Sequence, residues 1–172
     1  MLAAIEMGTM GRTAKAKSPV DAGFTLVELM ITLVIAAVLA TIAAPSFRDY
    51  MASQRIKDGA FDLMAAIIFA RSEAIKRNAS VDVIPASAAT PKNWASGWTV
   101  SVGGTTLRKQ DAKSGLSITD SAALAKLTYG NDGRVTTSTA FLVDLTSSLS
   151  GVNPRCVTIS PSGAPSSKSG GC

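Results

Sequence analysis

The chain has 172 residues, a net charge of +5, 47% hydrophobic residues and no histidine. A chain of this length holds one domain with appendages, and the absence of histidine excludes Ser-His-Asp and Cys-His catalysis. The mild positive charge does not by itself indicate a nucleic-acid partner. Phosphate-binding glycine motifs and acidic clusters are also missing, so we expect no enzyme, no cofactor and no metal site. A serine-lysine dyad is left open, although nothing marks one.

The first 23 residues are polar and basic, with Arg12, Lys15 and Lys17 placed before an apolar run. Positive charge on one flank of an apolar helix keeps that flank cytoplasmic. We therefore expect the domain after the apolar run to face the periplasm or the cell exterior. Three methionines are alternative starts of the protein: Met1, Met7 and Met10.

An uncharged, mostly apolar run of 19 residues covers positions 29–47. It is close to the ~20 residues that a helix needs to cross a bilayer. Glu28 opens the run, and a carboxylate carried toward the membrane centre costs roughly 2.5–3.5 kcal/mol, so it requires a partner. The run predicts a membrane-spanning helix. Secretory cleavage after Ala44 and a generic single-pass anchor are the alternatives.

One long interrupted helix is predicted over about residues 24–79, with a kink at Pro45. Beyond Pro45 the apolar residues recur every three or four positions, which predicts an amphipathic half that lies on a globular core. The repeating positions are Ile56, Ala60, Leu63, Ile67, Ala70 and Ala74. Four further residues are expected to widen this buried face: Phe61, Met64, Ile68 and Ile75.

After Asn78 the sequence becomes typical of β-strands. Gly103-Gly104 predicts a two-residue hairpin turn, and residues 161–172 predict a tail without core-forming residues. One helix followed by a run of strands indicates an α+β fold with an antiparallel sheet against the helix. The predicted strands cover residues 81–84, 98–102, 105–109, 116–119, 127–129, 134–137, 141–145 and 156–160.

The two cysteines, Cys156 and Cys172, lie near the end of the chain. In an oxidising compartment a pair at this spacing is expected to form a disulfide, and this bond would be the main restraint on the tail. Two free thiols are the alternative. A metal site is not expected, because two thiolates without any histidine fall short of the four ligands that zinc usually takes.

The segment from Gly23 through Phe24 to Glu28, together with Pro45, resembles the N-terminus of type IV prepilins and pseudopilins. The resemblance implies that prepilin peptidase cleaves after Gly23 and that Phe24 becomes N-methylated. It also implies that Glu28 pairs with the Phe24 amine of an adjacent subunit during assembly, and that Pro45 bends the helix.

Four later segments resemble the FimT/GspH family: residues 69–78, the Trp-x-x-Gly-Trp pattern in 93–98, the Gly-Arg turn in 129–134, and 155–163. This family holds minor pilins of type IV pili and a minor pseudopilin of type II secretion. The resemblance implies a leader (1–23), a transmembrane and filament-core helix (24–47) and a periplasmic or extracellular pilin-like domain (48–172). Its partners would be other pilins, contacted through the N-terminal helix, and the inner membrane before assembly.

Some FimT-like members bind DNA through a basic Gly-Arg-x-Arg motif near the C-terminus. The corresponding place here contains Gly163 but neither arginine, so DNA binding is not favoured. We interpret the chain as a minor pilin-like subunit of a type IV pilus, with a type II secretion pseudopilin and a DNA-binding minor pilin as alternatives. The candidates for contact with DNA or a neighbouring subunit, if folding gathers them, are Arg108, Lys109, Arg134 and Arg155.

Overall fold

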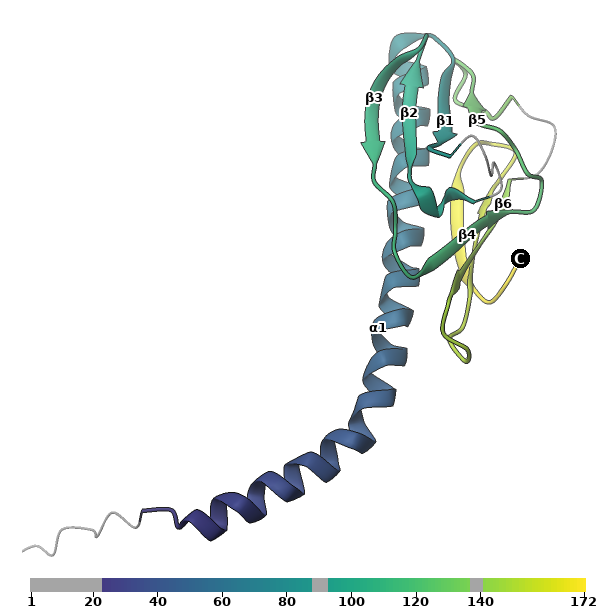
Figure 1. Cartoon of the computed structure of the whole chain (residues 1–172). Helices are drawn as coiled ribbons and strands as arrows, with labels where there is room; N and C mark the ends of the chain where they lie inside the picture. Colours follow the sequence, from purple (N-terminus) through teal and green to yellow (C-terminus); the bar gives the residue numbers. More distant parts are fainter. Residues whose placement is uncertain (1–22, 88–92, 137–140) are drawn as a thin grey trace, which may run out of the picture. The chain divides into compact units, whose positions relative to one another are not determined.

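The computed structural model describes residues 23–87, 93–136 and 141–172 (Figure 1). Contacts divide the chain into two compact units, Met1–Ala40 and Thr41–Cys172. Figure 1 shows that the strands gather beside the C-terminal half of the single long helix, within the second unit.

Helix α1 covers Leu26–Arg77, within two residues of each predicted end. It continues through Pro45, and the bend expected there stays a prediction. The helix ends because Asn78 takes a left-handed conformation with φ 50°. The Asn78 amide then donates to the Ile75 carbonyl at 3.3 Å, and the Ala79 amide donates to the Ala74 carbonyl at 3.2 Å. This pair of bonds is a Schellman cap, which satisfies carbonyls that the helix end leaves free.

The buried face of α1 follows the predicted spacing. Residues Ile56 through Ala74 of the repeating set are all at most 2% exposed, so that prediction is confirmed. Several positions on this face are alanine or glycine, which lets the strands approach the helix closely. A Cβ atom on Gly59 would lie 2.9 Å from Leu116 Cδ1 and 3.3 Å from Leu145 Cδ2. The glycine therefore marks a place where sheet and helix nearly touch.

The first sheet contains four antiparallel strands in the order β3-β2-β1-β5. The predicted hairpin at Gly103-Gly104 is confirmed, since it joins β2 to β3 and both glycines have positive φ. Strand β1 alternates buried and half-buried residues, as a strand with one face on a core should. The strand bounds are β1 Val81–Pro85, β2 Trp98–Val102, β3 Thr105–Gln110 and β5 Leu127–Tyr129.

A second antiparallel sheet has the order β4-β6-β7-β8. Both sheets share one core with α1, to which Val83 and Tyr129 contribute from the first sheet and Ile118 and Leu145 from the second. The predicted α+β class is confirmed, with the strands divided between two sheets. A short 3-10 helix, η1, covers Trp94–Ser96. The bounds of the second sheet are β4 Leu116–Asp120, β6 Leu142–Ser147, β7 Arg155–Ile159 and β8 Pro165–Ser169.

The expectation that the disulfide is the main restraint on residues 161–172 is wrong, because this segment forms strand β8. Strand β8 pairs with β7 along its whole length, from Pro165 opposite Ile159 to Ser169 opposite Arg155. Its residues are half-buried or exposed and mostly serine, so the apolar alternation that marks a strand is absent. Backbone pairing at a sheet edge does not require apolar side chains, and proline is tolerated at the first position of such a strand.

The strand predicted at residues 134–137 is also wrong in its described part. Val135 forms only an isolated bridge with Tyr129, and Thr137 lies outside the described residues. A tight turn takes the place of the strand, because the Gly130 amide donates to the Arg134 carbonyl at 2.8 Å. Asp132 Oδ1 accepts from the Arg134 amide at 3.0 Å, which uses the donor that a strand would need.

Gly163 lies where the β7–β8 turn meets the turn after β5, and we expect Gly163→Ala to destabilise the domain strongly. Its φ is 83°, and a Cβ atom would lie 2.3 Å from the Gly133 carbonyl oxygen and 3.0 Å from Tyr129 Cε1. Tyr129 Oη also donates to the Gly163 carbonyl at 2.8 Å, which holds this backbone in place. Positive φ and the clash together should lower the free energy of unfolding by about 3 kcal/mol, measured by urea denaturation.

Gly104→Ala is the matched control for this substitution. Gly104 has nearly the same φ, 84°, but nothing lies within 4 Å of its Cβ position. It should therefore lose only the conformational part, about 1 kcal/mol. Equal losses for the two variants would show that the close approach of Gly163 to Gly133 does not limit the packing.

Candidate assembly surface

The start of α1 is fixed by reciprocal hydrogen bonds between Thr25 and Glu28. The Thr25 amide and hydroxyl donate to Glu28 Oε2 at 2.9 and 3.0 Å, and the Glu28 amide donates to the Thr25 hydroxyl oxygen at 3.2 Å. This arrangement is a capping box, which satisfies amides that a helix start leaves free. One oxygen of Glu28, Oε2, therefore caps the start of the helix. The second oxygen, Oε1, accepts no hydrogen bond from the described residues.

The first part of α1 is apolar on every side. Its large side chains are between 54% and 81% exposed, counting Phe24 just before the helix, and the helix is long and apolar enough to cross a membrane. A helix that is apolar all round requires lipid or other apolar helices around it. The exposed apolar residues here are Phe24, Leu26, Val27, Leu29, Met30, Ile31, Leu33, Val34, Ile35, Val38 and Leu39.

A second apolar surface lies along α1 beside its buried face. Phe61, Ile68 and Ile75 are 60%, 53% and 53% exposed, so the prediction that they widen the buried face is wrong. The buried set occupies the arc that the two sheets cover, and each of these three residues lies just outside that arc. Met64, by contrast, packs partly against the core as expected. We call Phe61, Ile68 and Ile75 the outer stripe; their seven-residue spacing places them in one row along the helix.

The Trp-x-x-Gly-Trp pattern serves packing. Trp94 is fully buried and Trp98 is 1% exposed, and the Trp94 ring meets that of Phe141 edge to face at 5.4 Å between centroids. Gly97 has φ 95°, and a Cβ atom there would lie 2.3 Å from the Gln110 carbonyl oxygen. The glycine is required because the chain passes too close to β3 for any side chain.

The Gly-Arg turn after β5 packs against the C-terminal end of α1. A Cβ atom on Gly133 would lie 2.6 Å from Ile75 Cδ1 and 3.3 Å from Arg71 Nε. Burial raises the pKa of Tyr129 well above its usual range, while the positive charge of Arg71 acts in the opposite direction. One helical turn further on, the hydrogen bond from Arg77 Nε, at 2.6 Å, is the main cause that lowers the pKa of Glu73. The close approach of Gly133 to Ile75 and Arg71 places the turn against the helix, whereas the Arg77–Glu73 pair lies within the helix itself.

The four basic candidates do not form one patch. Arg108 and Lys109 lie on β3, the edge of the first sheet, and Lys109 pairs with Asp111 at 3.5 Å. Arg134 follows Gly133, which contacts Arg71 and Ile75 of α1. Arg155 lies on β7 of the second sheet and lines a pocket with Ser53, Ile56 and Lys57. Arg71 and Lys57 are ~21 Å apart along the helix axis, so Arg134 and Arg155 lie at different levels of the domain.

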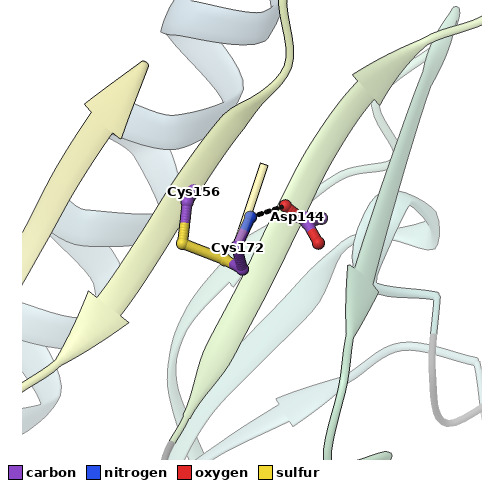
Figure 2. Close-up of side chains that lie close together, drawn as sticks. All are labelled: Asp144, Cys156 and Cys172. Atoms are coloured by element: carbon purple, nitrogen blue, oxygen red, sulfur yellow. Dashed lines mark hydrogen bonds between the residues drawn. A yellow bond between two sulfur atoms is a disulfide. The ribbon is translucent and has the colours of Figure 1, made fainter. Parts of the chain in front are cut away.

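The end of the chain is held by a covalent bond and a hydrogen bond. A disulfide joins Cys156 to Cys172, with a Cα–Cα distance of 5.0 Å. Figure 2 shows the Cys172 amide donating to Asp144 Oδ1, at 2.6 Å. The three side chains offer potential metal ligands within 4.8 Å of one another. The two sulfur atoms are bonded to each other, however, and only thiolates bind metal well, so this group is a structural clamp.

An apolar helix whose C-terminal half packs against two antiparallel sheets is a pilin-like fold. The family model described as "Type II transport protein GspH" matches residues 60–163, and the model "Prokaryotic N-terminal methylation motif" matches residues 20–44. The first of these matches covers more than half of the chain, and the protein therefore belongs to the GspH family.

Several known proteins are similar to this chain. Two proteins named "Fimbrial protein" from Pseudomonas aeruginosa are each 35% identical over 100 residues, which is 57% of this chain and 59% of theirs. The chain thus spans less than two thirds of these relatives. Fimbrial protein EcpC from Eikenella corrodens is 48% identical over 44 residues, 26% of this chain and 28% of its own.

A solved structure shows the same fold. The type IV minor pilin FimU from Pseudomonas aeruginosa superimposes with a TM-score of 0.60 at 21% identity, covering 67% of this chain and 89% of FimU. A second crystal form of FimU gives a TM-score of 0.58 at 22% identity, covering 65% and 91%. At this identity the match establishes the architecture, in which one helix packs on antiparallel sheets.

Proposed function

We propose that this protein is a minor pilin-like subunit of a type IV pilus that acts in pilus assembly. The observation that carries the proposal is a helix with apolar residues exposed on every side, opened by a single carboxylate, ahead of a domain of the GspH family. Such a helix is stable only among lipid or other apolar helices. The fimbrial relatives and the FimU fold support the pilus over other filaments.

In this proposal residues 1–23 are a leader that prepilin peptidase removes after Gly23, and Phe24 becomes N-methylated. Residues 24–47 then anchor the subunit in the inner membrane with the N-terminus on the cytoplasmic side, and residues 48–172 form the periplasmic domain. During assembly the same helix leaves the lipid and packs against helices of other pilins, with Pro45 bending it. The outer stripe extends this contact surface onto the second half of α1.

The test is the chemical state and location of the protein in cells that make pili. Mass spectrometry of protein from sheared filaments should give a mature N-terminus at methylated Phe24. Gly23→Glu should leave the leader attached and keep the subunit in the membrane fraction. An intact leader in the wild-type protein, or a start after Ala44, would contradict the proposal.

A type II secretion pseudopilin is the second candidate, and the description of the matching family as a type II transport protein favours it. Deletion of the gene separates the two. Loss of surface pili with normal protein secretion supports the pilus, whereas loss of secretion with normal piliation supports the secretion filament.

We predict that DNA binding is weak and non-specific, with a Kd no tighter than ~10⁻⁶–10⁻⁴ M at physiological salt. Tight binding needs several cations on one surface, and the basic candidates lie on different sheets and at different levels of the domain. Titration of the purified full chain in detergent with labelled duplex DNA measures this. Sub-micromolar binding that Arg134→Ala or Arg155→Ala abolishes would instead indicate an uptake receptor.

A further inference from the structure

A small polar pocket lies between α1 and the second sheet, at the start of the packed half of the helix. Its volume is about 100 Å³. The helix contributes Ser53, Ile56 and Lys57, and the opposite wall comes from the segment that leads into β7, from the first residue of β7 and from the end of β8. The lining residues are Ser53, Ile56, Lys57, Asn153, Pro154, Arg155 and Ser169.

The pocket contains two cations and no carboxylate. Lys57 and Arg155 are its charged residues, and both are half-buried. Arg155 Nε donates to Ser167 Oγ at 2.7 Å, which holds the guanidinium in place. Its other four N–H donors have no partner among the described residues. Two positive charges that line one small pocket repel each other, so an anion held in that pocket would be stabilised by both.

Lys57 forms no ion pair within the described chain, unlike most of the other described lysines. Four others pair with carboxylates of their own chain: Lys76 with Glu73, Lys109 with Asp111, Lys113 with Asp62 and Lys126 with Asp82. Within the described ranges, Lys57 and Lys168 form no ion pair. Lys168 is exposed on β8, whereas Lys57 lies in a pocket beside a second cation and polar groups.

We propose that this pocket binds the carboxylate of an Asp or Glu side chain from a neighbouring pilin subunit. A volume of this order holds a carboxylate with one or two waters, since a water occupies ≈ 30 Å³, and it is too small for a nucleotide. The proposal rests on the assembly role proposed above. Lys57 lies one helical turn before Phe61 of the outer stripe, so a helix packed on that stripe would bring its side chains near the pocket.

Zero-length carbodiimide coupling of sheared filaments tests the contact, because it joins an amine to a carboxylate only where the two touch. In the wild-type mature subunit we expect an amide bond between Lys57 and an acidic residue of another pilin, identified by mass spectrometry. Lys57→Arg should enter filaments normally but give no coupled product, because a guanidinium keeps the charge without the reactive amine.

Removing either charge should weaken incorporation. Lys57→Gln and Arg155→Gln should each lower the amount of subunit per filament by about 10-fold at equal membrane levels. Lys168→Gln, which removes an exposed unpaired lysine outside the pocket, should have no effect.

Two outcomes would overturn the proposal and can be told apart. Absence of the wild-type subunit from filaments would refute the assembly role itself, and the pocket contact with it. If the wild-type subunit is present but Lys57 is not coupled, or if Lys57→Gln enters filaments as well as the wild type, only the pocket contact is refuted.

Discussion

Replacing Glu28 with alanine is expected to leave the subunit in the membrane and its leader cleaved, but to lower incorporation into filaments at least about 10-fold. One oxygen of this carboxylate accepts both hydrogen bonds from Thr25, and the other has no partner in the described chain. Among apolar helices an unpaired carboxylate is costly, and a positive charge placed beside it is strongly favoured. In the proposed filament that charge is the Phe24 amine of an adjacent subunit. Immunoblots of sheared filaments and membranes give the ratio.

Two further substitutions separate the charge of Glu28 from its capping role. Glu28→Gln keeps an oxygen that can accept from Thr25 but loses the charge, so it should fail in incorporation like the alanine variant. Thr25→Val removes the hydroxyl of the capping box but keeps the carboxylate, so it should incorporate better than either. Normal incorporation of Glu28→Gln would show that the capping box, and not the charge, is what assembly requires.

The helix was predictable because its signals are local. The apolar spacing from Ile56 to Ala74 describes the buried face, and Asn78 can adopt the left-handed conformation that ends a helix. The hairpin at Gly103-Gly104 was predictable for the same reason, since two glycines permit the positive φ angles of a tight turn. These features depend on residues within a few positions of one another.

The errors concern features that depend on distant parts of the chain. Strand β8 exists because β7 offers it a free edge, and a row of serines does not reveal this. The exposure of Phe61, Ile68 and Ile75 depends on how far two sheets wrap around α1, which the helical period alone does not fix. A surface that binds a partner also needs hydrophobic residues, and in the sequence these follow the same helical spacing as core residues. The spacing alone therefore does not distinguish a binding surface from the core.

The candidate site likewise has a part that nearby residues define and a part that depends on residues far apart in the sequence. Gly23, Phe24 and Glu28 lie within six consecutive residues, so this motif could be recognised from the sequence. The Trp-x-x-Gly-Trp pattern of Trp94 and Trp98 could be recognised for the same reason. The pocket could not, because Lys57 and Arg155 are far apart in the sequence and neither has a distinctive neighbourhood. The sequence marks Arg155 only as a basic residue. That Arg155 and Lys57 line the same pocket depends on how the second sheet packs against α1.

Cys172→Ser is expected to lower the free energy of unfolding by about 3 kcal/mol while leaving β8 in place. The disulfide spans a sequence separation of 16 residues and encloses the β7–β8 hairpin, so its loss acts mainly by freeing the unfolded chain. The sheet pairing from Pro165 to Ser169 does not depend on it. Cys172 is the better residue to replace because it is exposed, whereas Cys156 is 1% exposed and part of the packing.

Urea denaturation of the full chain in detergent, followed by tryptophan fluorescence, measures this loss, since both tryptophans of the chain are buried in the domain. Asp144→Ala is the control, because it removes the hydrogen bond to the Cys172 amide and keeps the disulfide. It should cost only about 1 kcal/mol. A reducing agent should bring the wild type to the level of Cys172→Ser and leave that variant unchanged. If the urea midpoint of the wild type is the same with and without the reducing agent, the disulfide does not constrain the chain. The pairing of β8 with β7 and the hydrogen bond from Cys172 to Asp144 would then be sufficient to hold the end of the chain.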